Sequence, residues 1–434
     1  MIELWEQFGY KEGATLEDLI DPNFLPVMKS EGVRRFSKKK EDGLCFKFWK
    51  VDNQDYFRFQ TSYFVGVDWI EEGKPIYVAP KQNKYDVEID YLKMLMDALE
   101  EHSDSKHLEE LFEVDFEKPF IQIQQSQDLL TPLLIYQYLN LLKRIVKKGL
   151  RKSYYKVDRN LNARVKGKVL INQTIKQNLV KSKITSTVCR FEEFGINSVE
   201  NKVLKKALEF SKSVLSSYKS QLPNASSICA YIEPAFQLVN SEVNILDLKH
   251  IKPNPLFPEY EQALKLAKII LKKYGYSISK TTENKIETPP FWIDMSKLFE
   301  LYVYSKLIKE FPLPGEVLYH KKYNRQEPDF ILNSQDGEFK MVVDAKYKPK
   351  YENNNISTED IRQISGYARM IKIYNDLKIK DYSKVISCLV IYSHQSALED
   401  LNKATFKENA EQEYVEFYKV GIRLPEIESK KSQT

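Results

Sequence analysis

The sequence predicts an α+β protein of several domains, with an N-terminal β-rich region, a helical middle region and a C-terminal α/β domain built on a mixed sheet. Its 434 residues are too many for one ordinary hydrophobic core. Short aromatic and β-branched runs mark the beginning, helical periodicity marks the middle, and helices alternate with apolar strands toward the end. We therefore divide the chain into residues 1–115, 116–285 and 286–434.

The N-terminal region contains a β-hairpin signal. Residues 63–67 and 75–79 are short β-forming runs, and a turn with Gly73 separates them. So short a hairpin buries too little surface to be a core by itself. Its apolar side chains suit a protein interface, so we expect this region to dock a partner, with packing on the middle region as the alternative. These side chains are Phe64, Val67, Trp69, Ile76, Tyr77 and Val78.

The middle region has helical periodicity. Thr131-Pro132 is typical of a helix start, and Gly149 is typical of the end of the same helix. Residues 201–215 and 259–273 predict two more amphipathic helices.

A basic segment follows the first of these helices. Between residues 143 and 183, Lys and Arg far outnumber Asp and Glu, although the whole chain carries a formal charge of only +5. Such a cluster favours contact with nucleic acid or with an acidic partner surface, and a solvated surface is the alternative. The candidate contacts are Lys147, Lys148, Arg151, Arg164, Lys166 and Lys168.

Cysteine usage and hydropathy predict a reducing, cytoplasmic location. The four cysteines lie far apart and form no CxxC pair, which argues against a thiolate zinc site and a disulfide framework. The N-terminus is acidic and lacks the apolar segment of a signal peptide. The longest apolar runs, such as residues 385–392, are too short to cross a bilayer, so we expect no membrane contact.

The C-terminal region alternates helices and strands. The predicted helices are residues 295–311 and 358–375, and the predicted strands are residues 316–323, 329–332, 339–347, 385–392 and 413–420.

Two acidic residues and a lysine on these strands carry the chemistry. Asp344 and Lys346 are two residues apart on a strand and share a face, and Asp329 opens the neighbouring strand. Converging carboxylates suit Mg²⁺, which prefers oxygen ligands and keeps several waters. One such water can attack a phosphodiester while Lys346 orients or deprotonates it, or stabilises the pentacovalent phosphate. A D-x-K pattern alone is more often an exposed strand face.

Two helical residues strengthen this interpretation. Glu300 lies within an apolar helix, where an unpaired carboxylate would be costly. Gln363 and Tyr367 are one helical turn apart on the helix that follows the Asp344 strand.

The ordered set of motifs resembles the PD-(D/E)xK nuclease superfamily and, more narrowly, the McrC family, the nuclease subunit of McrBC-type restriction systems. Pro328-Asp329 and Asp344-Ala345-Lys346 carry the nuclease motif. Segments similar to other family signatures are residues 64–66, 79–81, 150–154, 164–169, 201–205 and 298–300. Residues 164–168 depart from the Arg-Gly-Arg type of sequence that the family often has, although both versions are cationic.

The resemblance implies an Mg²⁺-dependent endonuclease of double-stranded DNA, with a restriction-endonuclease-like C-terminal domain and a role in anti-phage defence. It implies Asp329 and Asp344 as metal ligands, and Lys346, Glu300 and Gln363 as further catalytic residues. It also implies docking, through the N-terminal region, onto a hexameric AAA+ GTPase of the McrB type whose hydrolysis it stimulates. No GxxxxGK[ST] loop is present, so the motor must be another chain. The alternatives are a non-enzymatic activator of the GTPase and a stand-alone DNA endonuclease.

Overall fold

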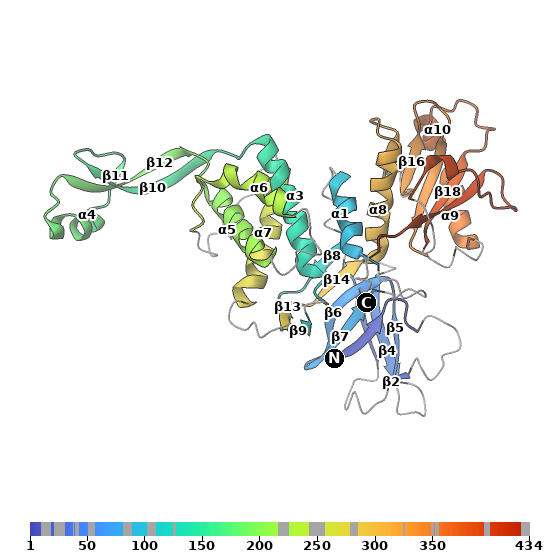
Figure 1. Cartoon of the computed structure of the whole chain (residues 1–434), viewed down its shortest axis with the longest axis horizontal. Coiled ribbons are helices and arrows are strands. Elements are labelled where there is room, and N and C mark those ends of the chain that lie inside the picture. Colours follow the sequence, from blue (N-terminus) through green and yellow to red (C-terminus); the bar gives the residue numbers. More distant parts are fainter. Residues whose placement is uncertain are drawn as a thin grey trace, which may run out of the picture. The chain divides into compact units, whose positions relative to one another are not determined.

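The computed structural model divides the chain into two compact units, shown in Figure 1. Unit 1 comprises residues 1–130 and 282–434, and unit 2 comprises residues 131–281, which form an insertion in unit 1. The structure describes residues 1–9, 19–20, 31–37, 39, 43–50, 57–80, 89–101, 110–124, 127–215, 225–242, 257–277, 285–323, 326–348, 351, 356–394 and 400–426. Mixed sheets and helices confirm the predicted α+β class, whereas the division into three functional regions stays a prediction.

Two sheets and a helix form the N-terminal half of unit 1. One sheet has the order β1 (Ile2–Trp5), β7 (Lys74–Ala79), β6 (Phe64–Glu71), β14 (Phe291–Asp294) and β8 (Phe112–Val114). The other has the order β2 (Leu19–Ile20), β5 (Phe57–Thr61), β4 (Leu44–Lys50) and β3 (Glu31–Arg35). Helix α1 is Tyr91–Glu101. The predicted hairpin is confirmed as β6 and β7, with Gly73 in the left-handed conformation at its turn.

The hairpin side chains lie in the core, which corrects their predicted place at an interface. Five of the six expected interface residues are buried, namely Phe64, Val67, Ile76, Tyr77 and Val78. Phe64, Ile76 and Val78 pack with Phe46, Phe48 and Phe59 of the second sheet and with Trp292 of β14. These side chains of the hairpin therefore have apolar partners within unit 1.

Strands β9 (Ile121–Gln124) and β13 (Lys285–Thr288) flank the insertion in the sequence and pair with each other antiparallel. This pairing brings together the two places where the chain leaves and re-enters unit 1. A C-terminal strand, β14, then continues into the N-terminal sheet between β6 and β8.

The C-terminal half of unit 1 is built on a mixed sheet, as predicted. The order is β15 (Val317–Tyr319), β16 (Phe330–Asn333), β17 (Lys340–Lys346), β18 (Ser387–His394) and β19 (Phe417–Arg423). The first three strands pair antiparallel, and β17, β18 and β19 pair parallel. The helices are α8 (Met295–Glu310), α9 (Thr358–Ala368) and α10 (Ile371–Asp376). The expected helix 358–375 is broken at Met370, whose backbone is extended.

Unit 2 contains the three predicted helices, α3 (Leu130–Lys148), α5 (Val199–Leu215) and α7 (Pro258–Ser277). It also contains α6 (Ala225–Phe236), which was not predicted. Gly149 follows α3 with a φ of 91°, in the left-handed region, as expected of a helix end. In the described part of the chain, no helix is long and apolar enough to cross a membrane.

Residues 153–195, here called the arm, add a β-structure to the mostly helical middle region. Strands β10 (Ser153–Asn162) and β12 (Ser186–Gly195) pair antiparallel along their whole lengths, and the short strand β11 (Lys168–Val169) joins β12. The tip carries helix α4 (Ile171–Gln177) and the 3-10 turn η4 (Leu179–Lys181). Figure 1 shows the paired strands reaching away from the helices of unit 2.

Candidate functional site

The strand register brings Asp329 and Asp344 together. Phe330 of β16 is opposite Val343 of β17, so Asp329, which precedes Phe330, lies beside Asp344. The backbone N–H of Ala345 donates to Asp329 Oδ2 at 2.9 Å and fixes this carboxylate against β17. The two acids thus meet, as expected from the pairing of their two strands.

Lys346 lies between these acids and helix α9. Its Nζ is 2.7 Å from Asp344 Oδ2 and donates to Gln363 Oε1 at 3.3 Å. Gln363 in turn donates through Nε2 to the hydroxyl of Tyr367 at 3.1 Å. Gln363 and Tyr367 therefore face the same way, as expected from their spacing, and Gln363 also contacts the lysine.

Glu300 is the third predicted acid, and it comes from helix α8. Its Oε1 accepts from Lys297 Nζ at 2.9 Å and from the Tyr319 hydroxyl at 2.6 Å, and it lies 2.5 Å from His320 Nε2. These neighbours offset the expected free-energy cost of placing a carboxylate in an apolar helix, because they pair its charge.

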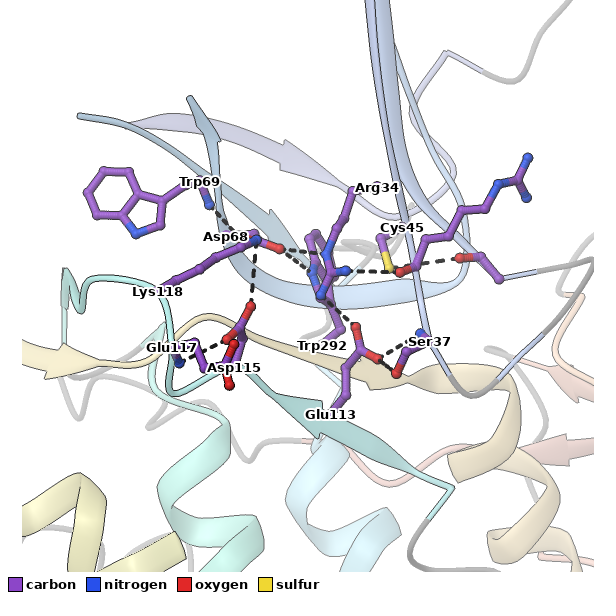
Figure 2. A network of polar contacts seen from close by, with 12 residues as sticks. Arg34, Ser37, Cys45, Asp68, Trp69, Glu113, Asp115, Glu117, Lys118 and Trp292 are labelled. Carbon is purple, nitrogen blue, oxygen red and sulfur yellow. Dashed lines mark hydrogen bonds and ion pairs between the residues drawn. The ribbon is translucent and has the colours of Figure 1, made fainter. Parts of the chain in front are cut away.

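Figure 2 shows how the N-terminal sheet anchors the strand that leads into α8. Asp68 is fully buried and accepts from Arg34 Nε at 2.7 Å, Lys118 Nζ at 2.7 Å and Trp292 Nε1 at 3.1 Å. Trp292 belongs to β14, which ends at Asp294, and the Asp294 side chain caps α8. The position of Glu300 therefore depends on contacts made in the N-terminal half of unit 1.

Two residues of the site were missed by the sequence analysis. Asp360, at the start of α9, is buried, is 3.8 Å from Lys346 Nζ, and accepts from Lys348 Nζ at 2.7 Å and from the Tyr351 hydroxyl. His320 follows β15 with a φ of 46° and contacts Glu300. Neither residue has a sequence signal of its own, because both are brought in by tertiary packing.

Burial and charge set the pKa values of the acids in opposite directions. Burial, and then repulsion from neighbouring carboxylates, raises the pKa of Asp329 well above its ordinary value. Burial also raises the pKa of Asp344, although Lys346 opposes the rise. Burial alone would raise the pKa of Glu300, but the hydrogen bond to His320 and the charge of Lys297 outweigh it and lower this pKa. Asp344 and Asp329 likewise outweigh burial and raise the pKa of Lys346.

The donors of this cluster fit a divalent cation. A bound cation reduces the repulsion between carboxylates that raise each other's pKa. Carboxylates are also the ligands that Mg²⁺ prefers. Asp344 Oδ2 is buried and makes no hydrogen bond of good geometry, and its close neighbour is the Lys346 ammonium. Within the described residues, Glu300, His320 and Asp329 form a group whose ligand atoms all lie within 4.8 Å of one another.

The predicted basic contacts fall into two groups. Lys147, Lys148 and Arg151 lie at or just after the end of α3, where Lys148 pairs with Glu259 and Arg151 lies 3.5 Å from Glu200. Arg164, Lys166 and Lys168 are exposed on the arm. Of these three, Lys166 lies 4.3 Å from the centre of the Phe191 ring, and none forms an ion pair with another described residue.

Comparison with known families gives the class of protein. Residues 59–379 match the profile of the family described as "McrBC 5-methylcytosine restriction system component". This match covers more than half of the chain, and the chain belongs to that family. A comparison with curated proteins found no match.

Two solved assemblies from Thermococcus gammatolerans contain similar chains. One is a refined half-complex from a tetradecameric assembly of McrB AAA+ hexamers with bound McrC, where the match has 14% identity, a TM-score of 0.38, and covers 97% of this chain and 94% of that one. The other is the McrBC complex, with 14% identity, a TM-score of 0.30, and coverage of 75% and 89%. The family assignment rests on the profile match alone.

Proposed function

We propose that this chain is a McrC-type, Mg²⁺-dependent DNA endonuclease subunit of a restriction complex. The observation that carries the proposal is the convergence of Asp329, Asp344 and Lys346 at one end of β16 and β17, with Glu300 and Gln363 beside them. Two adjacent carboxylates next to an ammonium group are what metal-assisted phosphodiester hydrolysis requires.

Each residue has a separate task in this proposal. Asp329 and Asp344 would hold the metal, which when bound supplies Lewis-acid stabilisation and acidifies a bound water. Lys346 would orient the attacking water or stabilise the negative charge that develops on the phosphate. Gln363 keeps the Lys346 amine in place through its 3.3 Å contact, and Glu300 supports the site from α8.

We also propose that an AAA+ GTPase of the McrB type is the partner. One similar assembly contains McrB AAA+ hexamers with bound McrC, and the other is a McrBC complex. The N-terminal region remains the predicted docking region, but the β6–β7 hairpin cannot supply the contact through its buried side chains. The arm is the second candidate, because it exposes apolar side chains next to its lysines and arginines. The exposed apolar residues at its tip include Val165, Ile171, Leu179, Val180 and Ile184.

Cleavage assays with and without the GTPase partner separate the proposal from its two alternatives. The chain alone, with Mg²⁺, should cut plasmid DNA poorly, and addition of the partner with GTP should produce cleavage. Efficient cutting without the partner would indicate a stand-alone endonuclease. Stimulated GTP hydrolysis without cleavage under any condition would indicate a non-enzymatic activator.

A further inference from the structure

His320 lies between two glutamates in the candidate site. Its Nδ1 is 3.0 Å from Glu327 Oε1, and its Nε2 is 2.5 Å from Glu300 Oε1. The backbone N–H of His320 donates to the carbonyl oxygen of Asp329 at 3.0 Å, which holds the residue beside Asp329. The imidazole therefore belongs to the same cluster as the acids, although no strand pattern predicted it.

The contact with Glu327 orients the imidazole as in a metal site. In metalloproteins, a carboxylate that accepts a hydrogen bond from Nδ1 fixes the imidazole and directs its Nε2 toward the metal. Lys322 Nζ lies 3.6 Å from Glu327 Oε2 and supports that carboxylate from outside. This carboxylate–histidine pair is the arrangement that fixes histidine ligands in metalloproteins.

His320 Nε2 and the Glu300 carboxylate have a cation as their common neighbour. Nε2 and Oε1 are 2.5 Å apart, and a positive charge beside both stabilises the carboxylate. Lys297 Nζ supplies such a charge here, at 2.9 Å from Glu300 Oε1 and 3.0 Å from His320 Nε2. The same ammonium lies 5.3 Å from the centre of the Tyr319 ring, which can receive it if a metal takes its place.

We infer that His320 Nε2 and Glu300 join Asp329 and Asp344 as metal ligands, and that Lys297 holds His320 and Glu300 together when the metal is absent. The inference rests on the proposed function and specifies the metal of that site. Adjacent ligands of an octahedral ion with bonds of about 2.1 Å are about 3.0 Å apart, and opposite ones about 4.2 Å. The ligand atoms of Glu300, His320 and Asp329 lie within 4.8 Å of one another, so small side-chain shifts suffice.

A nitrogen ligand changes which metal the site prefers. Mg²⁺ favours sites made of oxygen alone, whereas an imidazole adds affinity for first-row transition ions. We therefore assign the site to an ion of the Mn²⁺ class, with Mg²⁺ as a weaker occupant.

Electron paramagnetic resonance of Mn²⁺ bound to the full-length chain tests the inference directly. Pulsed measurements should show nitrogen hyperfine coupling in the wild-type protein, and the coupling should change when histidine is labelled with ¹⁵N. His320→Gln should abolish the coupling and weaken Mn²⁺ binding by at least about tenfold. His394→Gln is the matched control, because His394 lies at the end of β18, and it should retain the coupling.

The lysine and the second glutamate provide independent readouts. Lys297→Met should tighten Mn²⁺ binding, because the metal no longer has to displace an ammonium group. Glu327→Gln should weaken Mn²⁺ binding about tenfold or more while leaving the nitrogen coupling detectable. Circular dichroism and thermal unfolding of each variant confirm that it is folded.

The outcomes separate this inference from the proposed function. Mn²⁺ that binds without nitrogen coupling, with an affinity that depends on Asp344, would overturn the role of His320 and leave the nuclease proposal intact. Lys297 would then be the permanent cation of the cluster. Absence of both Mn²⁺ and Mg²⁺ binding would overturn the inference and the proposed metal site together.

Discussion

At the scale of single residues, the charges on the acids of the site carry an electrostatic cost in the folded protein. Asp329 and Asp344 are held side by side, and burial raises the pKa of each above that of an ordinary aspartate. Such cost persists only where surrounding packing enforces it, and it is common at functional sites. Removing one charge should therefore stabilise the protein while damaging its chemistry.

Asp329→Asn should raise the free energy of unfolding at neutral pH in a buffer with chelator. The folded-state pKa of Asp329 is raised, so its favourable contribution is complete below the unfolded pKa of about 3.9 and is lost as pH rises through the folded pKa. The advantage of the variant should grow over that window and vanish below about pH 4. Urea unfolding at a series of pH values measures it.

Asp381→Asn is a control of opposite sign. The hydrogen bond from Ser383 lowers the pKa of Asp381, so this aspartate stabilises the fold above its unfolded pKa, and its loss should cost stability there. A variant at Asp329 that is less stable than wild type at neutral pH would contradict the account of the buried acids.

The sequence revealed some residues of the site and could not reveal others. Asp344 and Lys346 share a strand face, and Asp329 precedes the paired strand, so local pattern was enough to place them together. His320 and Asp360 enter the site through a turn and a helix start, and their partners are distant in the sequence. Tertiary packing alone brings them in.

At the scale of elements, β14 links the two halves of unit 1 through close backbone approach at Gly66. A Cβ atom built on Gly66 would lie 2.0 Å from the carbonyl oxygen of Phe291, across the β6–β14 pairing. Gly66→Ala should therefore lower the free energy of unfolding by about 1–3 kcal/mol, because the backbone must shift. Denaturant unfolding measures this loss.

Gly366→Ala is the matched control for that substitution. Gly366 lies within helix α9, and a Cβ atom added there would make no contact within 4 Å. Alanine should stabilise the helix by about 0.5–1 kcal/mol. Equal effects of the two substitutions would contradict the close approach of β6 and β14.

The arm was missed because its strands bury only a small cluster, made of Leu161, Cys189 and Phe191. In β10 most side chains are exposed or half-buried, and exposed Lys156 and Asp158 alternate with half-buried neighbours. Alternation this weak was not separated from the helical pattern on either side of the arm. Three helices of unit 2, α3, α5 and α7, were predicted, and α6 was not.

Charge reversal on the arm tests its role as a contact surface. Arg164→Glu combined with Lys168→Glu should leave thermal unfolding unchanged, since both side chains are exposed. If the arm contacts DNA, affinity should fall, and the slope of log K against log salt should decrease by about 0.9 for each lost phosphate contact. If it contacts the motor, stimulation of GTP hydrolysis should fall instead.

Lys309→Glu with Lys380→Glu changes the net charge equally at exposed sites in unit 1 and serves as the control. A result in which the arm variant and the control match wild type in both assays would identify the arm lysines and arginines as solvated surface.

At the scale of the whole molecule, the three sequence regions differ from the two compact units. Residues 1–115 and 286–434 share a unit because β14 supplies a strand to the N-terminal sheet and Trp292 fills its core. The sequence predicts a middle region of residues 116–285, whereas unit 2 comprises residues 131–281. The sequence could not show that the two neighbours of this region are one unit, because strand pairing across so long a separation leaves no local pattern.

Excision of unit 2 tests this organisation. Joining residue 130 to residue 282 through a short Gly-Ser linker should give a folded protein, because β9 and β13 already pair where the insertion begins and ends. Its thermal unfolding should remain cooperative, and its metal affinity should match that of the full chain. A truncated chain of residues 1–115 should instead fail to fold, because it lacks β14, which pairs with both β6 and β8. Cooperative unfolding of the truncation and none in the excised chain would contradict this division.

The most direct test of the nuclease assignment is DNA cleavage by Asp344→Asn in the reconstituted complex with the GTPase, GTP and Mg²⁺. Asp344 is buried beside Lys346 and is no part of the exposed surfaces proposed for docking, so the variant should assemble and stimulate GTP hydrolysis normally. We expect its cleavage rate to fall by at least about 10³-fold, as for the loss of a principal electrostatic contributor to catalysis. Asp381→Asn should cut like wild type. Cleavage by Asp344→Asn at the wild-type rate would contradict the assignment of this site to catalysis.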